Sequence, residues 1–529
     1  MAIKILDCTL RDGGYINNWL FRKNHIYSIV NHLNSAKIDF IECGYLNYEI
    51  EKDDDLTIFK DINQFHSLVV SEKSEKDSNF LMMINYGEYP IDKIPVNNGQ
   101  ILGIRVAFHK KDWKEALLYC KQLINKKYAV FVQPMITINY TDEELLKLIY
   151  EVNTINPYAM YIVDSFGVMK QKDLLRMTYL LDNNLNSSIT LGYHAHNNLQ
   201  LAFSNAQVFC ETKLHRDIII DSSVYGMGRG AGNLNTELFV KYLNENFSKS
   251  YIETPLLKII DESLSAIYQE HYWGYSLPYF ISAKYNCHPK YASYLVSKNS
   301  LTIESIEQVI SKIAFDKKDS FDQMYIETLY IEFQSIYGNI YRNNINEIFI
   351  NKHVLIVGPG KSLSELFNRD KIKDYINKNN PIVVSLNFYP EWLEVDYTFI
   401  SNKKRFSSMK NIINKNLIIT SNIEYSNAQY CINYKSVLYD DINLHDNSLI
   451  MLLKLLINSK ASHVILAGVD GYNVEITQNY IDLDHLIPMS KENVNILNSK
   501  ISKALIQLSK NIAIDFITQS KYVSDKPLL

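Results

Sequence analysis

Two short stretches of the 529-residue chain carry side chains that could bind a metal ion and act on a substrate. Arg11 and Asp12 follow the apolar run Ile3–Leu6, which has the pattern of a buried strand. His194 and His196 end another apolar run, and a spacing of two residues places both rings on the same side of a strand. A carboxylate and two imidazoles leave open positions on a bound cation for water or a bidentate substrate. We therefore predict a metal site formed by Asp12, His194 and His196.

A glycine-rich loop follows the last apolar run of this part of the chain. Residues 226–233 are Gly-Met-Gly-Arg-Gly-Ala-Gly-Asn. In an eight-stranded barrel, Asn233 would reach the rim that carries Asp12 and the two histidines, so we expect it to converge with them. Four glycines in seven residues favour a close approach of the backbone to a substrate carboxylate or phosphate, and a tight turn is the alternative. We assign substrate binding to Gly228, Arg229 and Gly230.

The predicted ligand set contains no thiolate, which favours Mg²⁺ or Mn²⁺ and also accommodates Co²⁺, Fe²⁺ or Zn²⁺. Beside it, Arg11 carries a permanently charged, bidentate guanidinium that can hold negative charge developing on an oxygen atom. A structural ion pair with Glu42, at the end of the second apolar run, is the alternative, and the two roles are compatible. We include Arg11 and Glu42 among the candidate catalytic residues.

Elements that could position these residues recur along residues 1–248. Apolar runs alternate with segments of helical periodicity such as Glu115–Ile124 and Glu143–Val152. Eight strands alternating with helices over about 245 residues is the expected size of a (β/α)8 barrel, or TIM barrel. The short interval between the third and fourth runs predicts a reduced helix there. The eight runs are Ile3–Leu6, Phe40–Cys43, Phe80–Ile84, Ile101–Ala107, Ala129–Val132, Ala159–Val163, Ile189–Gly192 and Ile218–Ile220.

Two further regions complete the expected α/β architecture. Residues 251–269, 276–286 and 301–313 have helical patterns, so we predict a helical extension over 249–345 at the barrel mouth. A strand that begins at His353 and runs into a glycine turn and a helix opens residues 346–529, for which we predict a Rossmann-like α/β domain with an open doubly wound sheet. Its further predicted strands are Ile382–Leu386, Tyr397–Ile400, Leu417–Thr420 and His463–Ala467.

Composition excludes several classes of protein. A chain of this length exceeds one hydrophobic core, so we expect two or three domains. The net charge of −4 gives no basic surface for nucleic acid. No segment approaches 18 consecutive apolar residues, and the N-terminus lacks the layout of a signal peptide, so we expect neither a membrane span nor secretion. The six scattered cysteines form no C-x-x-C pair, which is typical of reduced thiols in a cytoplasmic protein.

Three motifs together resemble the signatures of the DRE-TIM metallolyases, the HMGL-like family. They are Thr9-Leu-Arg-Asp-Gly, Gly192-Tyr-His-Ala-His-Asn-Asn and the loop at 226–233. Within that family the chain is most similar to pyruvate aldolases of the 4-hydroxy-2-oxovalerate type, which segments Ile104–His109 and Val163–Gly167 also resemble. The resemblance covers residues 1–290. It implies that Arg11 stabilises the enolate of a 2-oxo acid, that Asp12, His194 and His196 are the metal ligands, and that Asn233 is a fourth or outer ligand.

Departures from the family pattern bear on the proton transfers and on the substrate. Tyr15 stands where the aldolases carry a histidine, and its unperturbed pKa of about 10 makes it a poor base without help. Tyr275 is a second acid/base candidate because its Gly-Tyr context resembles a tyrosine of the aldolases' helical extension; a core aromatic is the alternative. The glycine loop carries Arg229 and no counterpart of the lyases' mobile-loop cysteine, which argues against hydroxymethylglutaryl-CoA cleavage. Arg105, in the segment similar to the aldolases' fourth strand, completes the substrate-binding candidates.

The turn Val357-Gly-Pro-Gly-Lys-Ser362 lacks the spacing of a P-loop and of the G-x-G-x-x-G fingerprint. A helix N-terminus after it could still bind phosphate. The turn faintly resembles the start of bacterial sialyltransferase-like and pterin-pyrophosphokinase-like Rossmann domains, as do two segments that contain Asn387 and Asp470. This implies a nucleotide or nucleotide-sugar site, and the alternative is a domain that has kept the fold and lost the site. The nucleotide-binding candidates are Gly358, Gly360, Ser362, Asn387 and Asp470.

These interpretations converge on a bifunctional enzyme. We expect the barrel to make or break a carbon–carbon bond next to a pyruvate-like 2-oxo acid, with an aldehyde as second substrate, through a metal-stabilised enolate. We expect the C-terminal domain to be a nucleotide-sugar transferase. The open alternatives are a Claisen-type acyl-CoA condensation and a barrel that serves only as a scaffold for the transferase. A homodimer is also left open.

Overall fold

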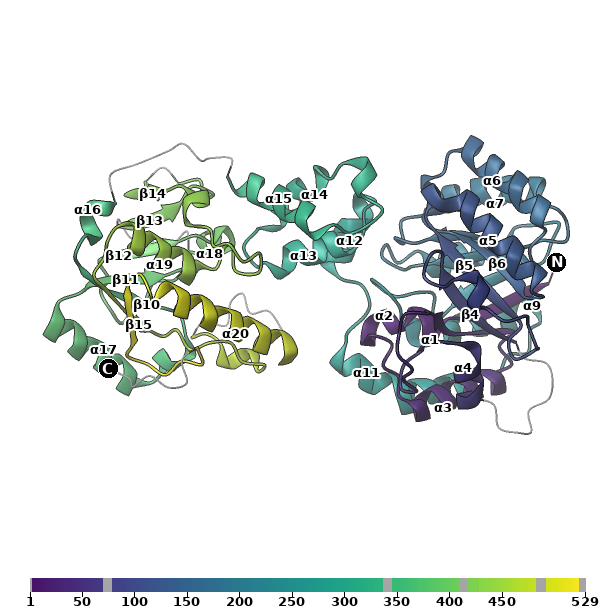
Figure 1. Cartoon of the computed structure of the whole chain (residues 1–529), viewed down its shortest axis with the longest axis horizontal. Coiled ribbons are helices and arrows are strands. Elements are labelled where there is room, and N and C mark those ends of the chain that lie inside the picture. The colour runs from purple at the N-terminus through teal and green to yellow at the C-terminus, as the bar shows by residue number, and fades with distance from the viewer. Residues whose placement is uncertain are drawn as a thin grey trace. The chain divides into compact units, whose positions relative to one another are not determined.

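The chain forms two compact units in the computed structural model (Figure 1). The first unit comprises residues 1–290 and 318–320, and the second comprises 291–317 and 321–529. Each unit contains its own parallel β-sheet and buries its own apolar core. The residues that the structure describes are 2–69, 79–335, 345–409, 416–425, 427–481 and 491–522.

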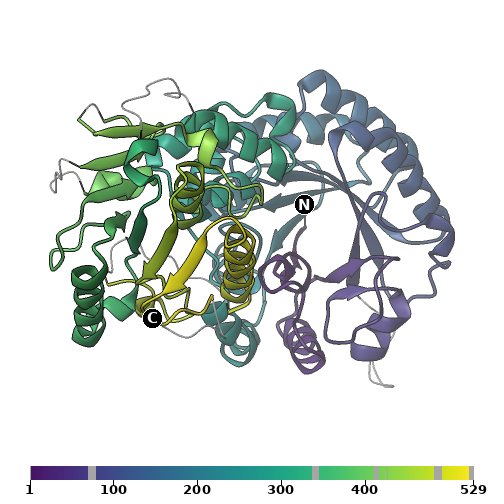
Figure 2. The same ribbon diagram turned by 60° about the vertical axis from the view of Figure 1, so that its left-hand side comes forward.

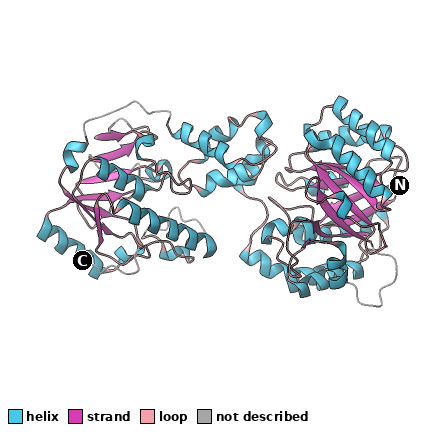
Figure 3. Ribbon diagram, in the orientation of Figure 1, coloured by secondary structure: helices cyan, strands magenta, loops and turns pink. Residues whose placement is uncertain are grey.

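The first unit is built on a closed barrel of parallel strands, seen in magenta in Figure 3. Neighbouring strands follow the order β1-β9-β8-β7-β6-β5-β4-β2, and pairing of β1 with β2 closes the barrel. The short strand β3 (Ile58–Phe59) pairs with the end of β2. All eight predicted runs are barrel strands, so the TIM-barrel prediction is confirmed. Their bounds are β1 (Ile3–Asp7), β2 (Phe40–Leu46), β4 (Phe80–Asn85), β5 (Gly103–Phe108), β6 (Ala129–Pro134), β7 (Ala159–Asp164), β8 (Thr190–Ala195) and β9 (Ile218–Ser222).

Helices connect the barrel strands and pack on their outer face. Between β4 and β5 the chain forms only the 3₁₀ turn η1 (Ile91–Lys93), so the predicted reduced helix is confirmed. The helix after β6 begins at a capping box in which Thr141 and Glu144 satisfy each other's backbone N–H groups. The connecting helices are α3 (Lys23–Ser35), α4 (Ile62–Val69), α5 (Trp113–Asn125), α6 (Asp142–Ile155), α7 (Gln171–Asn184), α8 (Ala202–Glu211) and α9 (Thr236–Phe247).

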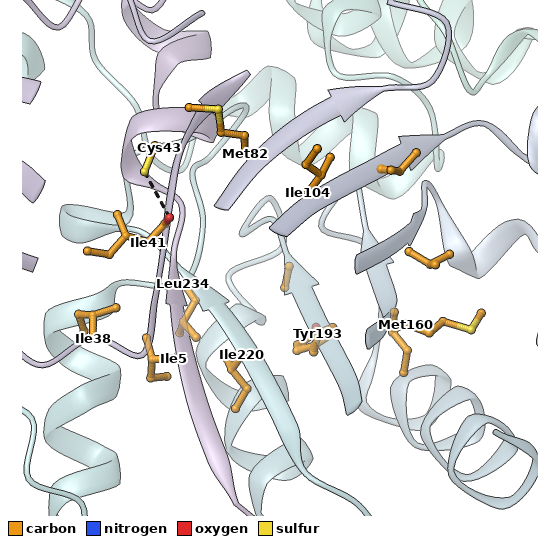
Figure 4. Packing of buried hydrophobic residues seen from close by; sticks show 14 of the residues in the cluster. Ile5, Ile38, Ile41, Cys43, Met82, Ile104, Met160, Tyr193, Ile220 and Leu234 are labelled. Carbon is orange, nitrogen blue, oxygen red and sulfur yellow. Dashed lines mark hydrogen bonds between the residues drawn. The ribbon is translucent and has the colours of Figure 1, made fainter. Parts of the chain in front are cut away.

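The barrel strands are apolar on both faces because helices cover the outside and side chains fill the inside. Figure 4 shows part of the outer layer, where Ile5, Met160 and Ile220 of three strands lie in one buried cluster. Leu6 and Phe131 belong to a second cluster, because alternate residues of a strand point to opposite faces. Polar side chains are therefore gathered at the carboxyl-terminal rim, above this inner apolar layer.

The helices that follow the barrel divide between the two units, and all three predicted helical segments contain helices. The first unit includes α10 (Glu253–Ile259), the π-helical turn η5 (Ile260–Leu264), α11 (Ser265–Glu270) and α12 (Leu277–Lys284). Apart from residues 318–320, the chain from Tyr291 onward belongs to the second unit. Its first helices are α13 (Lys290–Ser297), α14 (Ile303–Ser311) and α15 (Gln323–Gln334).

The second unit contains an open parallel sheet of order β14-β13-β12-β11-β10-β15-β16, which confirms a second α/β sheet. Val354 and Ile356 of β10 pack in one apolar cluster and Leu355 and Val357 in another, so both faces of the sheet are covered, with helices on both sides in Figure 2. The short strands β14 and β16 are not among the predicted runs. The strands are β10 (His353–Val357), β11 (Ile382–Leu386), β12 (Tyr397–Ile400), β13 (Leu417–Thr420), β14 (Tyr430–Ile432), β15 (His463–Ala467) and β16 (Ala513–Phe516). The helices are α16 (Asn346–Phe349), α17 (Leu366–Asn379), α18 (Lys403–Ser408), α19 (Ser448–Asn458) and α20 (Lys491–Leu508).

All six cysteines are buried and none is paired in a disulfide, in agreement with the prediction of reduced thiols. Within the described ranges, no helix combines the length and the apolar character needed to span a membrane.

Candidate metal centre and active site

The first turn after β1 delivers Asp12 to the carboxyl-terminal rim of the barrel. The four-residue helix α1 (Thr9–Asp12) begins two residues after the strand, and Asp12 is 1% exposed. Its Oδ1 accepts a hydrogen bond from Arg11 Nη1, and its Oδ2 accepts one from Asn233 Nδ2 at 2.8 Å and one from the backbone N–H of Arg229 at 3.3 Å. Burial is the largest influence and raises the pKa of Asp12, but the neighbouring basic groups, Arg11 first among them, together outweigh burial and hold this pKa well below its usual range. Asp12 is therefore a carboxylate.

Both histidines come from the end of β8. His194 Nδ1 lies 2.9 Å from Asp221 Oδ2, which leaves Nε2 as the nitrogen for a cation. His196 Nδ1 lies 3.7 Å from Asp12 Oδ2, is buried, and has no hydrogen-bond partner. Burial lowers the pKa of His196 far below its ordinary value although Asp12 opposes this shift. The ring is therefore neutral and can act as a ligand.

The three predicted ligands converge on one point. One ligand atom from each of Asp12, His194 and His196 lies within 4.8 Å of the other two. Asn233 adds a fourth group, because its Oδ1 is buried without a hydrogen-bond partner while its Nδ2 bonds to Asp12. Buried polar atoms normally have partners, so two unsatisfied acceptors beside a carboxylate fit a cation. Nitrogen and oxygen donors without a thiolate suit a divalent ion.

The glycine loop lies directly against these ligands. A Cβ atom on Gly228 would lie 2.3 Å from Asn233 Nδ2 and 2.7 Å from Asp12 Oδ2, so only glycine fits. Gly230 has a φ of +71°, and a Cβ atom there would lie 2.6 Å from Asn198 Oδ1. The close backbone approach expected from the sequence is therefore an approach to the ligands, and substrate binding by this loop stays a prediction.

A chain of buried ion pairs links His194 to Arg11. Arg11 Nε and Arg105 Nη1 both donate to Glu42 Oε2, each at 2.8 Å. Arg105 Nη2 donates to Asp221 Oδ2, the atom that also faces His194. Arg11 is thus held by Glu42 on one side and Asp12 on the other. Its Nη2 makes no hydrogen bond to the residues that the structure describes, so it remains available to a substrate.

Comparisons with known proteins agree with this geometry. A sequence model of the family described as HMGL-like matches residues 100–261. The 4-hydroxy-2-oxovalerate aldolase of Pseudoalteromonas translucida is 27% identical over 269 residues, which cover 49% of this chain and 74% of that enzyme. The aldolase of the same name from Geobacillus genomosp. 3 is 26% identical over 270 residues, which cover 49% and 75%. The crystal structure of the HMG-CoA lyase of Brucella melitensis, with 15% identity and a TM-score of 0.42, covers 51% of this chain and 99% of that one.

The barrel is similar in sequence to the HMGL-like aldolases and lyases, the DRE-TIM metallolyases. This similarity indicates a carbon–carbon lyase domain, and it agrees with the three motifs that meet at the carboxyl-terminal rim. The family match ends at residue 261, so it does not extend to the second unit.

Tyr15 lies beside residues that contact the candidate metal ligands, whereas Tyr275 is more exposed, and the acid/base roles of both stay predictions. The Tyr15 hydroxyl lies 3.1 Å from the Tyr45 hydroxyl, and the Tyr15 ring lies 5.5 Å from the guanidinium carbon of Arg229. Burial raises the pKa of Tyr45, so its hydroxyl keeps its proton. Tyr275 is 54% exposed, and its ring contact is with Phe280 at 6.5 Å.

The two arginines that we assigned to substrate binding occupy different environments. Arg105 is fully buried, lies 4.9 Å from the Tyr161 ring, and is engaged by Glu42 and Asp221. Arg229 is half-buried at the mouth, and its Nε has no hydrogen-bond partner. Arg229 therefore presents an available donor, whereas the polar atoms of Arg105 are used within the protein.

The nucleotide-binding candidates of the second unit bond mainly to one another and to nearby backbone. The N–H groups of Gly358 and Gly360 donate to the carbonyls of Ala467 and Gly468, each at 2.8 Å. Ser362 donates from its backbone N–H and from its hydroxyl to the Asp470 carboxylate, at 2.7 and 2.6 Å. Asn387, after β11, donates to the Ser448 hydroxyl at 2.6 Å. The amides that were expected to face phosphate are thus engaged in the protein.

Asp221 is the residue of the candidate site that the sequence analysis missed. It lies on β9, is buried, and bonds to both His194 and Arg105. Arg105 counteracts burial and lowers its pKa, so Asp221 is ionised. The available signal was a carboxylate within the otherwise apolar run Ile218–Ser222, because a charge inside a barrel strand needs a partner.

Proposed function

We propose that the barrel is a divalent-metal-dependent aldolase that forms or breaks a carbon–carbon bond next to a pyruvate-like 2-oxo acid. The observation that carries this proposal is the placement of Arg11. Its guanidinium is fixed by Glu42 and Asp12 beside the candidate ligands, while Nη2 stays open. A fixed guanidinium next to a metal centre suits a reaction in which negative charge develops on an oxygen.

The residues divide the chemistry between them. Asp12, His194, His196 and Asn233 would hold the ion, preferably Mn²⁺ or Mg²⁺, which would polarise the carbonyl of the 2-oxo acid when bound. Arg11 Nη2 donates to the oxygen that becomes negative in the enolate. Tyr15, hydrogen-bonded to Tyr45, donates a proton to the oxygen of the aldehyde as it becomes a hydroxyl.

Exchange of the pyruvate methyl protons with D₂O, followed by NMR, tests this function without an aldehyde. We expect exchange that requires added Mn²⁺ or Mg²⁺ and stops with a chelator, because enolate formation needs no second substrate. Absence of exchange under all metals tested would contradict the aldolase proposal. Exchange of acetyl-CoA methyl protons instead would favour the Claisen alternative.

For the second unit we propose binding of a nucleotide or nucleotide-sugar at the carboxyl edge of its sheet. Support comes from the strand order, which reverses between β10 and β15, because ligands of open α/β sheets bind at such a point. Gly358, Gly360, Ser362 and Asp470 lie there. Thermal unfolding of the full chain with CMP, CTP, UDP or ATP tests the proposal. A ligand at 100 times its dissociation constant stabilises by about 2.7 kcal/mol, and no shift with any of them would contradict it.

A further inference from the structure

Arg229 is the arginine of the barrel mouth that lacks a carboxylate partner. Arg11 and Arg105 each contact two carboxylates. The side chain of Arg229 instead makes one hydrogen bond to the described residues, from Nη2 to the carbonyl oxygen of Ser165 at 2.8 Å. Its Nε is buried and unpartnered. A buried donor without a partner is unfavourable in the free protein, and an anionic ligand beside this half-buried guanidinium would compensate its charge.

The position of Arg229 assigns it to one side of the active site. Its backbone N–H donates a hydrogen bond to Asp12 Oδ2 at 3.3 Å. This bond holds the backbone of Arg229 next to the metal ligands in any conformation of its side chain. From there the side chain reaches Ser165, after β7, and its guanidinium carbon lies 5.5 Å from the Tyr15 ring. Tyr15 is the proposed proton donor to the aldehyde oxygen. Arg229 therefore lies on the aldehyde side, while Arg11 faces the 2-oxo acid.

The surroundings of Arg229 leave its charge available. Burial and then the charge of Arg229 lower the pKa of His288 to about 3, and burial lowers the pKa of His109. Both imidazoles are consequently neutral at pH 7. Asp112 and Asp319 are the carboxylates whose charges act on His109, and Asp319 accepts a hydrogen bond from Asn139 at 2.8 Å. The charge of Asp12 is matched by Arg11.

We propose that Arg229 binds an anionic group of the aldehyde-side substrate, so that the barrel selects an aldehyde bearing a carboxylate or a phosphate over an uncharged one. The planar guanidinium presents paired N–H donors that match either oxyanion. This inference rests on the proposed aldolase function and names the substrate class of that site.

The bond-forming step balances without a further reactant. The methyl-derived carbon of the pyruvate enolate forms a bond with the aldehyde carbon, and the π electrons of the aldehyde carbonyl move to its oxygen. That oxygen takes one proton from the Tyr15 hydroxyl, which regains a proton from solvent. The product is a 4-hydroxy-2-oxo acid whose second anionic group stays bound to Arg229. The step requires no oxidant or reductant.

Two matched pairs of aldehydes test the selectivity with the full-length protein. The carboxylate pair is 4-oxobutanoate and its uncharged isostere 4-methylpentanal. The phosphate pair is D-glyceraldehyde 3-phosphate and D-glyceraldehyde. We expect the charged member of one pair to be favoured in kcat/KM by roughly 10- to 100-fold, the range for a hydrogen bond to a charged group. The pair that shows the preference identifies the oxyanion.

Substitution of Arg229 assigns this preference to one side chain. Arg229→Gln should reduce the preference for the charged aldehyde to within a few-fold of unity, and Arg229→Lys should retain part of this preference. Each rate is divided by the pyruvate proton-exchange rate of the same variant. Arg176→Gln is the matched control, because Arg176 lies exposed on α7 and pairs with Asp142. It should keep the wild-type preference.

Each outcome decides between the two proposals. Pyruvate proton exchange without any preference for a charged aldehyde overturns the inference and leaves the aldolase function standing. A preference that survives in Arg229→Gln also overturns it. Absence of pyruvate proton exchange in the wild type overturns the aldolase function itself.

Discussion

The two glycine-rich turns of the molecule differ in whether the polar atoms around them have hydrogen-bond partners. In the barrel, the loop at 226–233 presses against Asp12 and leaves acceptor atoms of His196 and Asn233 unsatisfied. In the second unit, the N–H groups of Gly358 and Gly360 donate to the carbonyl oxygens of Ala467 and Gly468, at the end of β15. Glycine content therefore indicates a close approach of the backbone but not its target. A ligand site is indicated by polar atoms that the protein leaves without partners.

The largest expected effect tests the unsatisfied acceptors of the barrel. His196→Ala should weaken binding of Mn²⁺ by more than about 100-fold, since removing a ligand exceeds the 10- to 100-fold effect of removing an outer partner. Calorimetric titration of Mn²⁺ measures this, with circular dichroism to verify folding. His32→Ala, on the surface of α3, is the control and should bind Mn²⁺ as the wild type does. Full Mn²⁺ affinity in His196→Ala would show that the ligand assignment is wrong.

Arg11→Lys tests whether the fixed guanidinium acts on the enolate. Lysine keeps the charge but cannot contact Glu42, Asp12 and a substrate oxygen together. The rate of pyruvate proton exchange should fall by about 100- to 1000-fold, the range for loss of one oxyanion donor. Affinity for Mn²⁺ in the same variant separates this effect from metal loss. An unchanged exchange rate would reduce Arg11 to a structural partner of Glu42.

Asp221→Asn should have a smaller effect, because Asp221 contacts both the candidate ligand His194 and the ion-pair network that holds Arg11. Asparagine keeps the shape but removes the charge that faces His194 and Arg105, so Mn²⁺ affinity should fall by about 10- to 100-fold. Titration with Mn²⁺ measures the fall, and proton exchange at saturating Mn²⁺ reports any displacement of Arg11. If Mn²⁺ affinity and exchange both remain at the wild-type level, Asp221 does not position His194.

The smallest expected effects come from glycine-to-alanine substitutions in the two glycine-rich turns, which allow the turns to be compared directly. Gly360→Ala places a Cβ atom 2.5 Å from the Gly468 carbonyl oxygen and should lower the free energy of unfolding by about 1–3 kcal/mol, as overpacking does. Its Mn²⁺ affinity should not change. Gly228→Ala should instead weaken Mn²⁺ binding, because its Cβ atom would displace Asp12 and Asn233. Thermal unfolding and Mn²⁺ titration of both variants test the contrast, which fails if both substitutions act alike.

Most of the barrel could be predicted because its signals are local. Each strand is an apolar run, and the order of strands in a closed barrel then places the ends of the first, seventh and eighth next to one another. That reasoning brought Asp12, His194, His196 and Asn233 together. The strand β14 has only three residues, and Asp515 interrupts the apolar run of β16, so neither strand shows a clear pattern of its own.

The partners of the charged residues could not be predicted in the same way. Nothing in the sequence near Arg105 shows that its guanidinium bonds to Glu42 and Asp221 and faces away from a substrate. The same limit applies to the turn after β10, because its acceptors lie more than one hundred residues downstream. Hydrogen bonds between distant segments depend on tertiary packing, which residue types and spacing do not report.

The hydrogen bond between Asp12 and Asn233 joins residues that are 221 positions apart in the chain, and it forms where β1 meets β9. A chain emerging from the ribosome makes Asp12 first, yet the candidate ligand set is incomplete until Asn233 has left the exit tunnel. No partial product of translation can therefore hold the ion as the finished barrel would. Uptake of the ion would report that the ring of strands has closed, which gives the cell a chemical marker for completed folding of this half of the protein.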